Sequence, residues 1–236
     1  MLAIIGGSGL TRLPELHLSG RRIVRTPYGL TSSPVLTGRL GRQDIVFLAR
    51  HGFGHTVAPH EINYRANIWA LHTLGATDII AVSSVVSIND DLSNGVLVMP
   101  HDLIDYTYGR QATFSEGGHE PVKHLDFLTP YAETLRSQLL QHAQSRNTPL
   151  YGEAVYGCLQ GPRWPTLAEV RRYRNDGVDI LGMTGMPEAV LAYELGMNYA
   201  HLCGIVGMRC LSSQAQACQS DAAATIETIR RLLVDL

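Results

Sequence analysis

Hydroxyl and imidazole side chains gather in short glycine-containing segments of the sequence, and groups of this kind bind small anions. The first segment, GGSG at residues 6–9, follows four apolar residues. Glycines after a strand let backbone N–H groups approach an anion, and the Ser8 hydroxyl adds a donor. The segment matches neither a GxGxxG nor a Walker motif, so it does not predict a nucleotide cofactor. Taken alone, it fits an ordinary tight turn equally well.

A second segment, RHGFGH at residues 50–55, also follows an apolar run. We expect a buried strand to hold Arg50 and His51 at the edge of a sheet, where the planar fork of an arginine suits phosphate. Ser83 and Ser84 would add hydroxyls at the carboxyl end of another strand, the position where α/β sheets bind ligands. Each feature also has an ordinary interpretation: a solvated loop with histidines, and the polar end of a strand.

A metal site is an alternative use of the same histidines. His51, His55 and His60 lie close together in the sequence, and His101 and Asp102 could join them. The chain would then be a metal-dependent hydrolase. No HExxH or comparable spacing supports a metal, so the sequence favours the anion site.

Two further segments each join an apolar run to a helical pattern. The first, QGPRWPT at residues 160–166, contains Trp164, which could stack on a heterocyclic base or pack in the core beside a capped helix. The second, GMTGMPEA at residues 182–189, contains Thr184, which could donate to an anion at a helix start, where the helix dipole favours negative charge. Met183 could line an apolar pocket, although core packing is the simpler use of a lone methionine.

Strands that alternate with helices must position these side chains. Short apolar runs predict strands at residues 2–5, 35–40, 44–49, 78–86, 96–99, 155–159, 180–183 and 200–206. Helical spacing predicts helices between Pro59 and Gly75 and at residues 135–144, 166–174, 187–195 and 222–236. The first helix would bury a face of Ile62, Ala66, Trp69, Ala70 and Thr73. The alternation predicts an α/β fold: a single domain over residues 1–236 with a central mixed, largely parallel twisted sheet flanked by helices.

The composition limits the classes of protein that remain. Apolar residues form 45% of the 236 residues, charged residues form 17%, and the formal net charge is −2. A chain this apolar can bury enough surface to fold, and its near-neutral charge argues against binding nucleic acid by phosphate neutralisation. No apolar run is long enough to span a membrane. The four cysteines have no zinc-ligand spacing, so we expect a reduced, cytoplasmic protein.

Taken together, these segments resemble the trimeric purine nucleoside phosphorylases, and most of all the branch that contains the methylthioadenosine and S-methyl-5'-thioinosine phosphorylases. The stretches that carry the resemblance are IIGGSGL, ARHGFGHTVAPHEINYRANIWAL, VYGCLQGPRWPT and GMTGMPEAVLAYELGM. The resemblance implies the nucleoside phosphorylase fold and a phosphate-dependent glycosyltransferase of purine salvage. Inorganic phosphate would attack C1′ of a purine nucleoside, releasing free purine and, from a methylthio-nucleoside, 5-methylthioribose 1-phosphate. Phosphate is then a co-substrate, and no metal or organic cofactor is implied.

The same resemblance implies roles for individual residues. The phosphate site would consist of Ser8, Arg50, His51, Ser83, Ser84 and Thr184. Met183 would lie under the ribose, and Trp164 takes the position that phenylalanine usually holds beside the base. His124 matches a histidine that a neighbouring subunit lends to the 5′ pocket in related enzymes, and His55 lies in the loop near that pocket. We therefore expect a homotrimer whose partners are a nucleoside and phosphate.

The sequence departs from the family where relatives bind the base. Relatives place Asp or Asn after the strand predicted at residues 200–206, and Gly207 takes that position here. A second Asp of the adenosine-type enzymes is replaced by Arg209, a possible contact to the base. The missing general acid typically contributes about 100-fold to 10,000-fold in rate. Two hypotheses remain for this pocket. One is a phosphorylase with a mild preference for methylthioinosine, whose carbonyl Arg209 could bind. The other is a catalytically weakened relative that binds purine-like or aromatic ligands there.

Overall fold

The computed structural model describes residues 1–117, 122–209, 222–234 and 236. Its strands are β1 (Leu2–Gly6), β2 (His17–Arg22), β3 (Val35–Leu40), β4 (Gln43–Ala49), β5 (Asp78–Ser87), β6 (Leu97–Val98), β7 (Asp102–Asp105), β8 (Leu150–Tyr151), β9 (Val155–Cys158), β10 (Ile180–Gly182) and β11 (Asn198–Met208). Its helices are α1 (Tyr64–Thr73), α2 (Glu133–Ser145), α3 (Leu167–Asn175), α4 (Gly185–Glu194) and α5 (Ala222–Val234). Each predicted strand and helix is present, and β2, β7 and β8 are additional.

The strands form one mixed sheet, which has eleven strands in the described residues and runs β2-β3-β4-β1-β5-β10-β9-β7, with β11, β6 and β8 off this path. The parallel pairs are β1–β4, β1–β5, β5–β11, β6–β8, β7–β9 and β9–β10. The antiparallel pairs are β2–β3, β3–β4, β5–β10 and β6–β11. The predicted mixed, largely parallel sheet is therefore confirmed.

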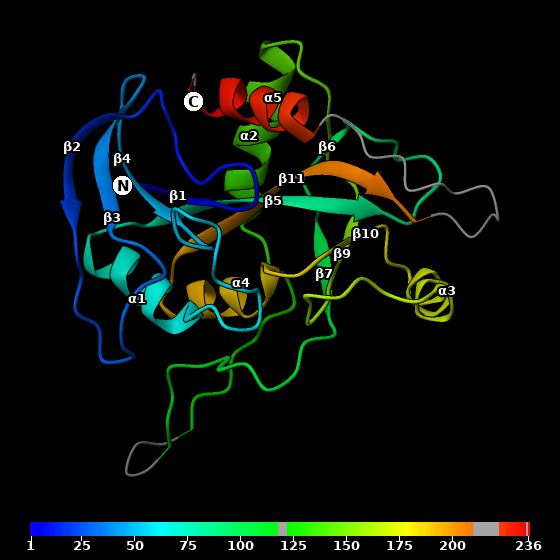
Figure 1. The fold of residues 1–236 in the computed structure, drawn as a ribbon, viewed down its shortest axis with the longest axis horizontal. Helices are drawn as coiled ribbons and strands as arrows, with labels where there is room; N and C mark the ends of the chain where they lie inside the picture. The colour runs from blue at the N-terminus through cyan, green and yellow to red at the C-terminus, as the bar shows by residue number, and fades with distance from the viewer. Residues whose placement is uncertain (118–121, 210–221, 235) are drawn as a thin grey trace.

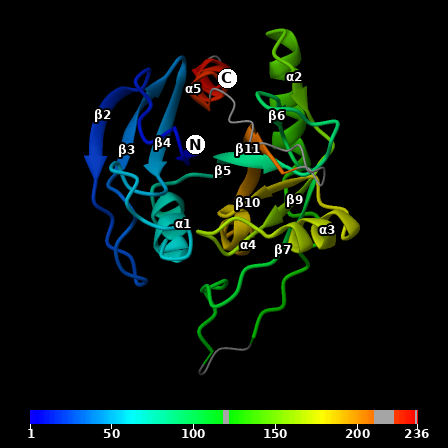
Figure 2. The same cartoon turned by 45° about the vertical axis from the view of Figure 1, so that its right-hand side comes forward.

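Helices cover both faces of this sheet (Figures 1 and 2). α1 and α4 lie on one face, where Ile68 and Leu191 join the larger buried cluster. α2 and α5 lie on the other face, where Leu139 and Ile229 belong to a second cluster. α3 packs at the far end of the sheet through Val170. Because both faces are buried, the central strands read as continuous apolar runs rather than as an alternating pattern.

The central strand β5 has a gap in its pairing along one edge. β1 pairs with β5 only as far as Ile5, which lies opposite Ala81. β10 pairs on the same edge farther along, opposite Val86 and Ser87. In the described structure, residues 82–85 therefore have a strand partner only on the other edge, where β11 runs alongside. This gap leaves room for side chains from the ends of the neighbouring strands.

The buried face of α1 differs from the predicted one. Thr73 is exposed, whereas Asn67, Ile68 and Leu71 are buried. Asn67 tolerates burial because its side-chain oxygen accepts from the Ser32 backbone N–H at 2.9 Å and its amide donates to the Ser32 hydroxyl at 3.0 Å. Because Asn67 is polar, a search for apolar residues at helical spacing does not assign it to the buried face of the helix.

Two expectations about the cysteines and the membrane can be compared with the structure. Cys158 and Cys203 are buried free thiols, and the other two cysteines lie outside the described residues. Within the described parts of the chain, we find no helix with the length and apolar character that crossing a bilayer requires.

Candidate active site

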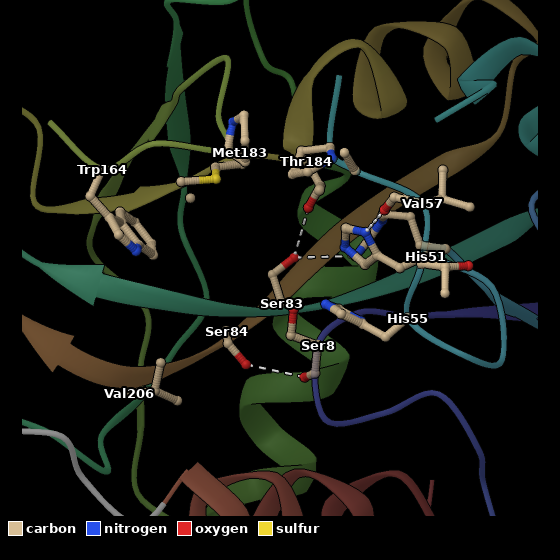
Figure 3. A pocket seen from close by; sticks show the side chains of 16 residues that line it. Ser8, His51, His55, Val57, Ser83, Ser84, Trp164, Met183, Thr184 and Val206 are labelled. Carbon is tan, nitrogen blue, oxygen red and sulfur yellow. Dashed lines mark hydrogen bonds between the residues drawn. The ribbon is translucent and has the colours of Figure 1, made fainter. Parts of the chain in front are cut away.

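A pocket of about 510 Å³ opens at the gap beside β5, a volume that suits a small organic molecule (Figure 3). Loops that leave β1, β4 and β10 converge there, as expected at the carboxyl ends of strands in an α/β sheet. The predicted residues among its lining are Ser8, Arg50, His51, His55, Ser83, Ser84, Trp164, Met183 and Thr184. Segments that are far apart in the sequence therefore meet in one place.

Arg50 supplies a buried positive charge at the floor of the pocket. Its side chain is fully buried, and its Nε and Nη2 atoms donate to the Glu188 carboxylate at 2.7 and 2.8 Å. Nη1 donates to the Val82 carbonyl at 2.9 Å and lies 3.5 Å from the Ser83 hydroxyl. The fork that we expected to face phosphate is thus already paired with a carboxylate, and only the Nη1 edge is directed at the other lining groups.

The loop after β1 approaches this arginine closely through Gly7. A Cβ atom at this position would lie 2.4 Å from the Val82 carbonyl oxygen and 2.8 Å from Nη1 of Arg50. Only glycine allows such an approach. The approach sets the position of Ser8, whose carbonyl accepts a hydrogen bond from the Ser84 hydroxyl at 3.1 Å.

Hydroxyl groups form the polar end of the pocket. The Ser83 and Thr184 oxygens are 3.2 Å apart, and both residues are buried. Ser8 and Ser84 lie beside them and are half-buried. The hydroxyls of Ser8, Ser83 and Thr184, together with the Nη1 edge of Arg50, make a compact set of donors suited to one small anion.

The start of α4 differs from the expected open anion site. The backbone N–H groups of Thr184 and Gly185 donate to the Tyr156 hydroxyl, each at 3.3 Å. The next backbone N–H, of Met186, donates to the Cys158 sulfur at 3.2 Å. These donors are occupied, so Thr184 would meet a ligand through its side-chain hydroxyl rather than through the helix terminus.

His51 is held in one protonation state beside these groups. Its Nδ1 atom lies 2.8 Å from the Val57 carbonyl, and a carbonyl can only accept, so Nδ1 carries the proton. Burial and the nearby charge of Arg50 lower the pKa of His51 to about 4. Near neutral pH the ring is therefore uncharged, and Nε2 is a hydrogen-bond acceptor. The His55 ring lies against it, with ring centroids 4.5 Å apart.

The other end of the pocket is apolar. Pro162, Trp164, Met183 and Val206 line it, and Figure 3 shows Trp164 and Met183 on the side away from His51. Gly161 makes room for the methionine, since a Cβ atom there would lie 2.6 Å from its sulfur. Trp164 is 37% exposed, so much of its ring remains open to a flat ligand.

The loop that carries Trp164 is anchored by the start of α3. Thr166 caps this helix, and the predicted capping box with Glu169 is present. Arg163 also donates to the same carboxylate, at 2.7 and 2.8 Å. The same segment can therefore cap α3 through Thr166 and present the Trp164 ring to a ligand.

The end of β11 brings a different residue to the pocket than the one we assigned. A β-bulge between Ile205 and Gly207 leaves Val206 to line the pocket, while Gly207 pairs with Val86. A Cβ atom at position 207 would lie 3.3 Å from a Val86 methyl group, so a larger residue would crowd this valine. In the described structure, Gly207 is not among the lining residues.

Arg209 lies beside Trp164 rather than in the pocket lining. Its guanidinium carbon is 5.9 Å from the centre of the Trp164 ring, within the range of a cation–π contact. Its backbone N–H donates to the Ser87 carbonyl at 2.8 Å. Its buried Nε atom has no hydrogen-bond partner among the described residues. A buried donor without a partner among the described residues thus lies next to the aromatic wall.

Of the histidines in the metal alternative, His51 and His55 lie together in the pocket, whereas His60 and His101 do not line it, and neither does His124. His124 is exposed and lines a separate pocket with Asp126 and Tyr193. His101 faces Glu153 at 3.7 Å, away from the candidate site. Over the ranges that the structure describes, no group of three or more His, Cys, Asp or Glu residues is placed to hold a metal ion.

Several supporting residues were not identified from the sequence. Arg110 donates to the carbonyls of Met183 at 2.9 Å and Gln160 at 2.7 Å, and so ties together the two loops of the apolar end. His201 on β11 lies 2.8 Å from the Ser83 hydroxyl. Arg110 and His201 lie in segments without a recognisable motif, so only the folded structure places them at the site.

Comparisons with known proteins agree with this geometry. The sequence model of the "Phosphorylase superfamily" matches residues 1–234. A Pseudomonas syringae protein named "Probable S-methyl-5'-thioinosine phosphorylase" is 47% identical over 204 residues, which are 86% of this chain and 83% of that protein. The "6-oxopurine nucleoside phosphorylase" of Pyrococcus furiosus is 44% identical over 204 residues, covering 84% of this chain and 76% of that protein.

A solved structure shares the fold over nearly the whole chain. It is "Methylthioadenosine phosphorylase from Schistosoma mansoni in complex with tubercidin", with a TM-score of 0.91 and 31% sequence identity. The alignment covers 99% of this chain and 89% of that one. The similarity therefore includes every element that contributes to the pocket.

Proposed function

This chain belongs to the phosphorylase superfamily, as its sequence motifs predicted, and we propose that it catalyses the phosphorolysis of a purine nucleoside. A 5′-methylthio-nucleoside is the proposed substrate class, with free purine and 5-methylthioribose 1-phosphate as products. One observation carries the proposal: a single pocket joins a polar end, built on Arg50, Ser83 and Thr184, to an apolar end with Trp164 and Met183. The first suits phosphate and the second suits a nucleoside.

The polar end would hold phosphate for attack on C1′. In the reaction, a phosphate oxygen forms a bond to C1′ while the bond from C1′ to the base nitrogen breaks and its electron pair leaves with the base. The sugar then carries positive charge, which a fixed anion beside it stabilises. The Nη1 edge of Arg50 and the hydroxyls of Ser8, Ser83 and Thr184 would keep the anion in this position. Ser84, whose hydroxyl donates to the Ser8 carbonyl, would hold the loop that carries Ser8.

His51 would accept a hydrogen bond from the protonated oxygen of phosphate. The dianion present near neutral pH carries one P–OH group, which is a donor, and the Nε2 atom of neutral His51 is an acceptor. A hydrogen bond between them would orient the other oxygens toward the hydroxyl donors and the sugar. The P–OH proton is lost from phosphate during the reaction, and the departing base gains one, so the protons balance.

The apolar end would bind the base and the ribose. Trp164 would stack on the purine, and Met183 would lie under the sugar. Val206, rather than an Asp or Asn, would face the base, so the described residues offer no carboxyl or amide to protonate or bind N7. The position of the Arg209 guanidinium beside Trp164 supports a mild preference for 6-oxopurines, whose carbonyl oxygen carries negative charge as the base leaves.

A homotrimer would complete the 5′ end of the site. His124 lies in the segment between β7 and α2, whose described parts project from the body of the chain (Figures 1 and 2). Val122 and Leu128 in this segment are 67% and 85% exposed. We propose that another subunit covers these two side chains in the trimer. We further propose that the enzyme needs no metal or organic cofactor and acts in the cytoplasm.

The proposal is tested by measuring base release from methylthioinosine, methylthioadenosine and inosine, each with and without phosphate. We expect release only with phosphate, and faster release of hypoxanthine than of adenine from the two methylthio-nucleosides. Faster adenine release would contradict the 6-oxopurine preference. Release that is independent of phosphate would contradict phosphorolysis itself.

The alternative of a weakened relative rests on the bulge at Val206 and the crowding of position 207 by Val86. It predicts that nucleosides bind without being cleaved. Calorimetric binding of methylthioinosine, together with no detectable base release in the same preparation, would favour this alternative.

A further inference from the structure

A buried histidine outside the predicted site touches its polar end. His201 lies on β11 and is fully buried. Its Nε2 atom is 2.8 Å from the Ser83 oxygen, the shortest of the three side-chain contacts to that oxygen. The other two are Thr184 Oγ1 at 3.2 Å and Arg50 Nη1 at 3.5 Å. Ser83 thus lies at the centre of a small hydrogen-bond network.

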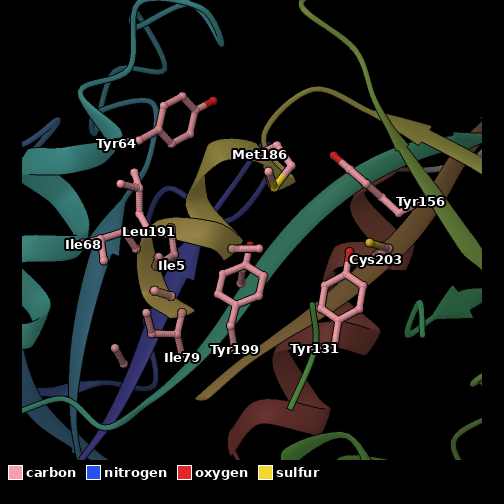
Figure 4. Close-up of a cluster of buried hydrophobic side chains, with 14 of the residues drawn as sticks. Ile5, Tyr64, Ile68, Ile79, Tyr131, Tyr156, Met186, Leu191, Tyr199 and Cys203 are labelled. Carbon is pink, nitrogen blue, oxygen red and sulfur yellow. The ribbon is translucent and has the colours of Figure 1, made fainter. Parts of the chain in front are cut away.

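On the side away from Ser83, aromatic side chains surround His201. Its ring packs against Tyr156, with centroids 4.7 Å apart, and lies near Tyr131 and Tyr199. Figure 4 shows these three tyrosines within the buried cluster. A Cβ atom at Gly185 would lie 3.3 Å from the imidazole, so the tight packing extends to the start of α4. The Nδ1 atom is buried and has no hydrogen-bond partner among the described residues.

These contacts decide which nitrogen of His201 carries the proton. If Nδ1 carried it, a buried N–H would have no acceptor, and orphaned N–H groups are rare in folded proteins. If Nε2 carries it, Nε2–H donates to the Ser83 oxygen and only a lone pair on Nδ1 lacks a partner. Burial and the charge of Arg50 lower the pKa of His201 to about 3, so the ring stays neutral near pH 7.

The choice of tautomer changes what Ser83 can offer to a ligand. A serine hydroxyl has one proton. If Nε2 accepted that proton, Ser83 would have none left for an anion. With Nε2 as the donor, the Ser83 oxygen accepts from His201 and from Arg50, and its proton is free for Thr184 or the pocket. When an anion is bound, the Ser83 and Thr184 protons can both turn toward it, in place of the hydrogen bond between the two hydroxyls.

We propose that His201 is a positioning residue, whose Nε2–H group holds the Ser83 oxygen so that the Ser83 hydroxyl proton faces the bound anion. The proposal rests on the proposed function in that the anion is taken to be phosphate. His201 itself does not touch the substrate. It acts through Ser83, which lines the pocket, whereas His201 is not among the lining residues.

Two variants with side chains of similar volume distinguish the effect of the His201 hydrogen-bond donor from the effect of its packing. In His201→Gln, the side-chain amide can place an N–H near the position of Nε2, whereas His201→Met fills the space without a donor. Calorimetric binding of inorganic phosphate is measured for the wild-type protein and both variants, and thermal melts report folding. We expect His201→Met to weaken phosphate binding about 10-fold, because a Ser83 hydroxyl that is no longer held loses its hydrogen bond to the charged anion. His201→Gln should remain within about 3-fold of the wild type.

The same comparison is made with Ser83→Ala as the background. If His201 acts through Ser83, changing His201 to Met in this background should cause no further loss of phosphate affinity. An equal loss with and without Ser83, or equal affinities for the Gln and Met variants, would overturn the proposal. In turnover assays, the effect should appear in the KM for phosphate and not in the KM for the nucleoside.

The tautomer can be observed without any activity. ¹⁵N spectra of histidine-labelled protein should show His201 protonated at Nε2 and unprotonated at Nδ1, and the opposite pattern would overturn the proposal even if a variant fails to fold. Absence of phosphorolysis in the wild-type protein would count against the proposed function alone. Phosphate binding and the tautomer would then still decide the role of His201.

Discussion

At the scale of single residues, Arg50 stabilises the folded core in addition to any contact that it makes with a ligand. Its guanidinium and the Glu188 carboxylate form a fully buried pair. Removing one partner of such a pair leaves an uncompensated buried charge, which typically costs about 3–5 kcal/mol of stability. Loss of activity in an Arg50 variant would therefore report misfolding as readily as a missing phosphate contact.

Thr184 offers a cleaner test of the phosphate site. Its side chain makes no capping bond to α4, so the helix start does not depend on its hydroxyl. We predict that Thr184→Val, which keeps the shape and removes one donor, raises the KM for phosphate about 10-fold. The KM for the nucleoside should change little. Steady-state kinetics with each substrate varied in turn checks this prediction, and an unchanged KM for phosphate would remove Thr184 from the site.

The buried histidines predict how stability depends on pH. The pKa of His51 is lowered to about 4 and that of His201 to about 3, from an ordinary value of 6.5. Between these values and 6.5, the unfolded chain binds more protons than the folded one, so stability falls as the pH falls through this range. Urea unfolding between pH 7 and pH 4 should show this decline, with a shallower slope in His201→Met. An equal slope in both proteins would contradict the lowered pKa of His201.

At the scale of elements, the loop after β1 depends on a close approach of the backbone. We predict that Gly7→Ala destabilises the protein by about 1–3 kcal/mol, because the new methyl group would overlap the Val82 carbonyl and Arg50. Gly54→Ala is a matched control, since a Cβ atom there lies at an ordinary 3.4 Å from the nearest side chain. Chemical denaturation measures both variants. Equal stability of the two would show that the loop moves without cost.

The elements most readily predicted from the sequence are those with both faces buried. β5 begins with the buried apolar run IIAV directly after Asp78, and its predicted start at Asp78 is confirmed. β2, in contrast, has the sequence HLSGRR and is almost wholly exposed, so no apolar pattern marks it. Its existence depends on pairing with β3, a contact that the local sequence does not reveal. The bulge at Val206 could not be predicted for the same reason. It is a shift in the register between β11 and β5, and register depends on both strands.

The candidate site could be predicted only in part, for a related physical reason. Ser8, Arg50 and Thr184 lie in loops at the ends of predicted strands, so motif and position together identify them. Arg110 and His201 act from segments far away in the sequence, and their role appears only once the chain has folded. Sequence patterns thus located the residues that face the pocket better than the residues that hold them in place.

At the scale of the whole molecule, the proposed homotrimer makes a distinct prediction. His124 lies away from the pocket of its own chain, so its contribution to catalysis would have to come from a neighbouring subunit. We predict that His124→Ala lowers kcat/KM for methylthioinosine while unfolding remains unchanged. Sedimentation equilibrium should give the mass of three chains. A monomer with full activity would contradict both the assembly and the role of His124.

The proposed phosphorolysis is tested most directly by measuring where the phosphorus of inorganic phosphate goes during the reaction. ³¹P spectra of the protein with methylthioinosine and inorganic phosphate should show phosphate consumed and a sugar 1-phosphate formed, in equal amounts with free hypoxanthine. Phosphorolysis requires that no hypoxanthine is released when phosphate is omitted. Release of hypoxanthine together with free methylthioribose, at the same rate with or without phosphate, would show that the enzyme is a hydrolase and not a phosphorylase.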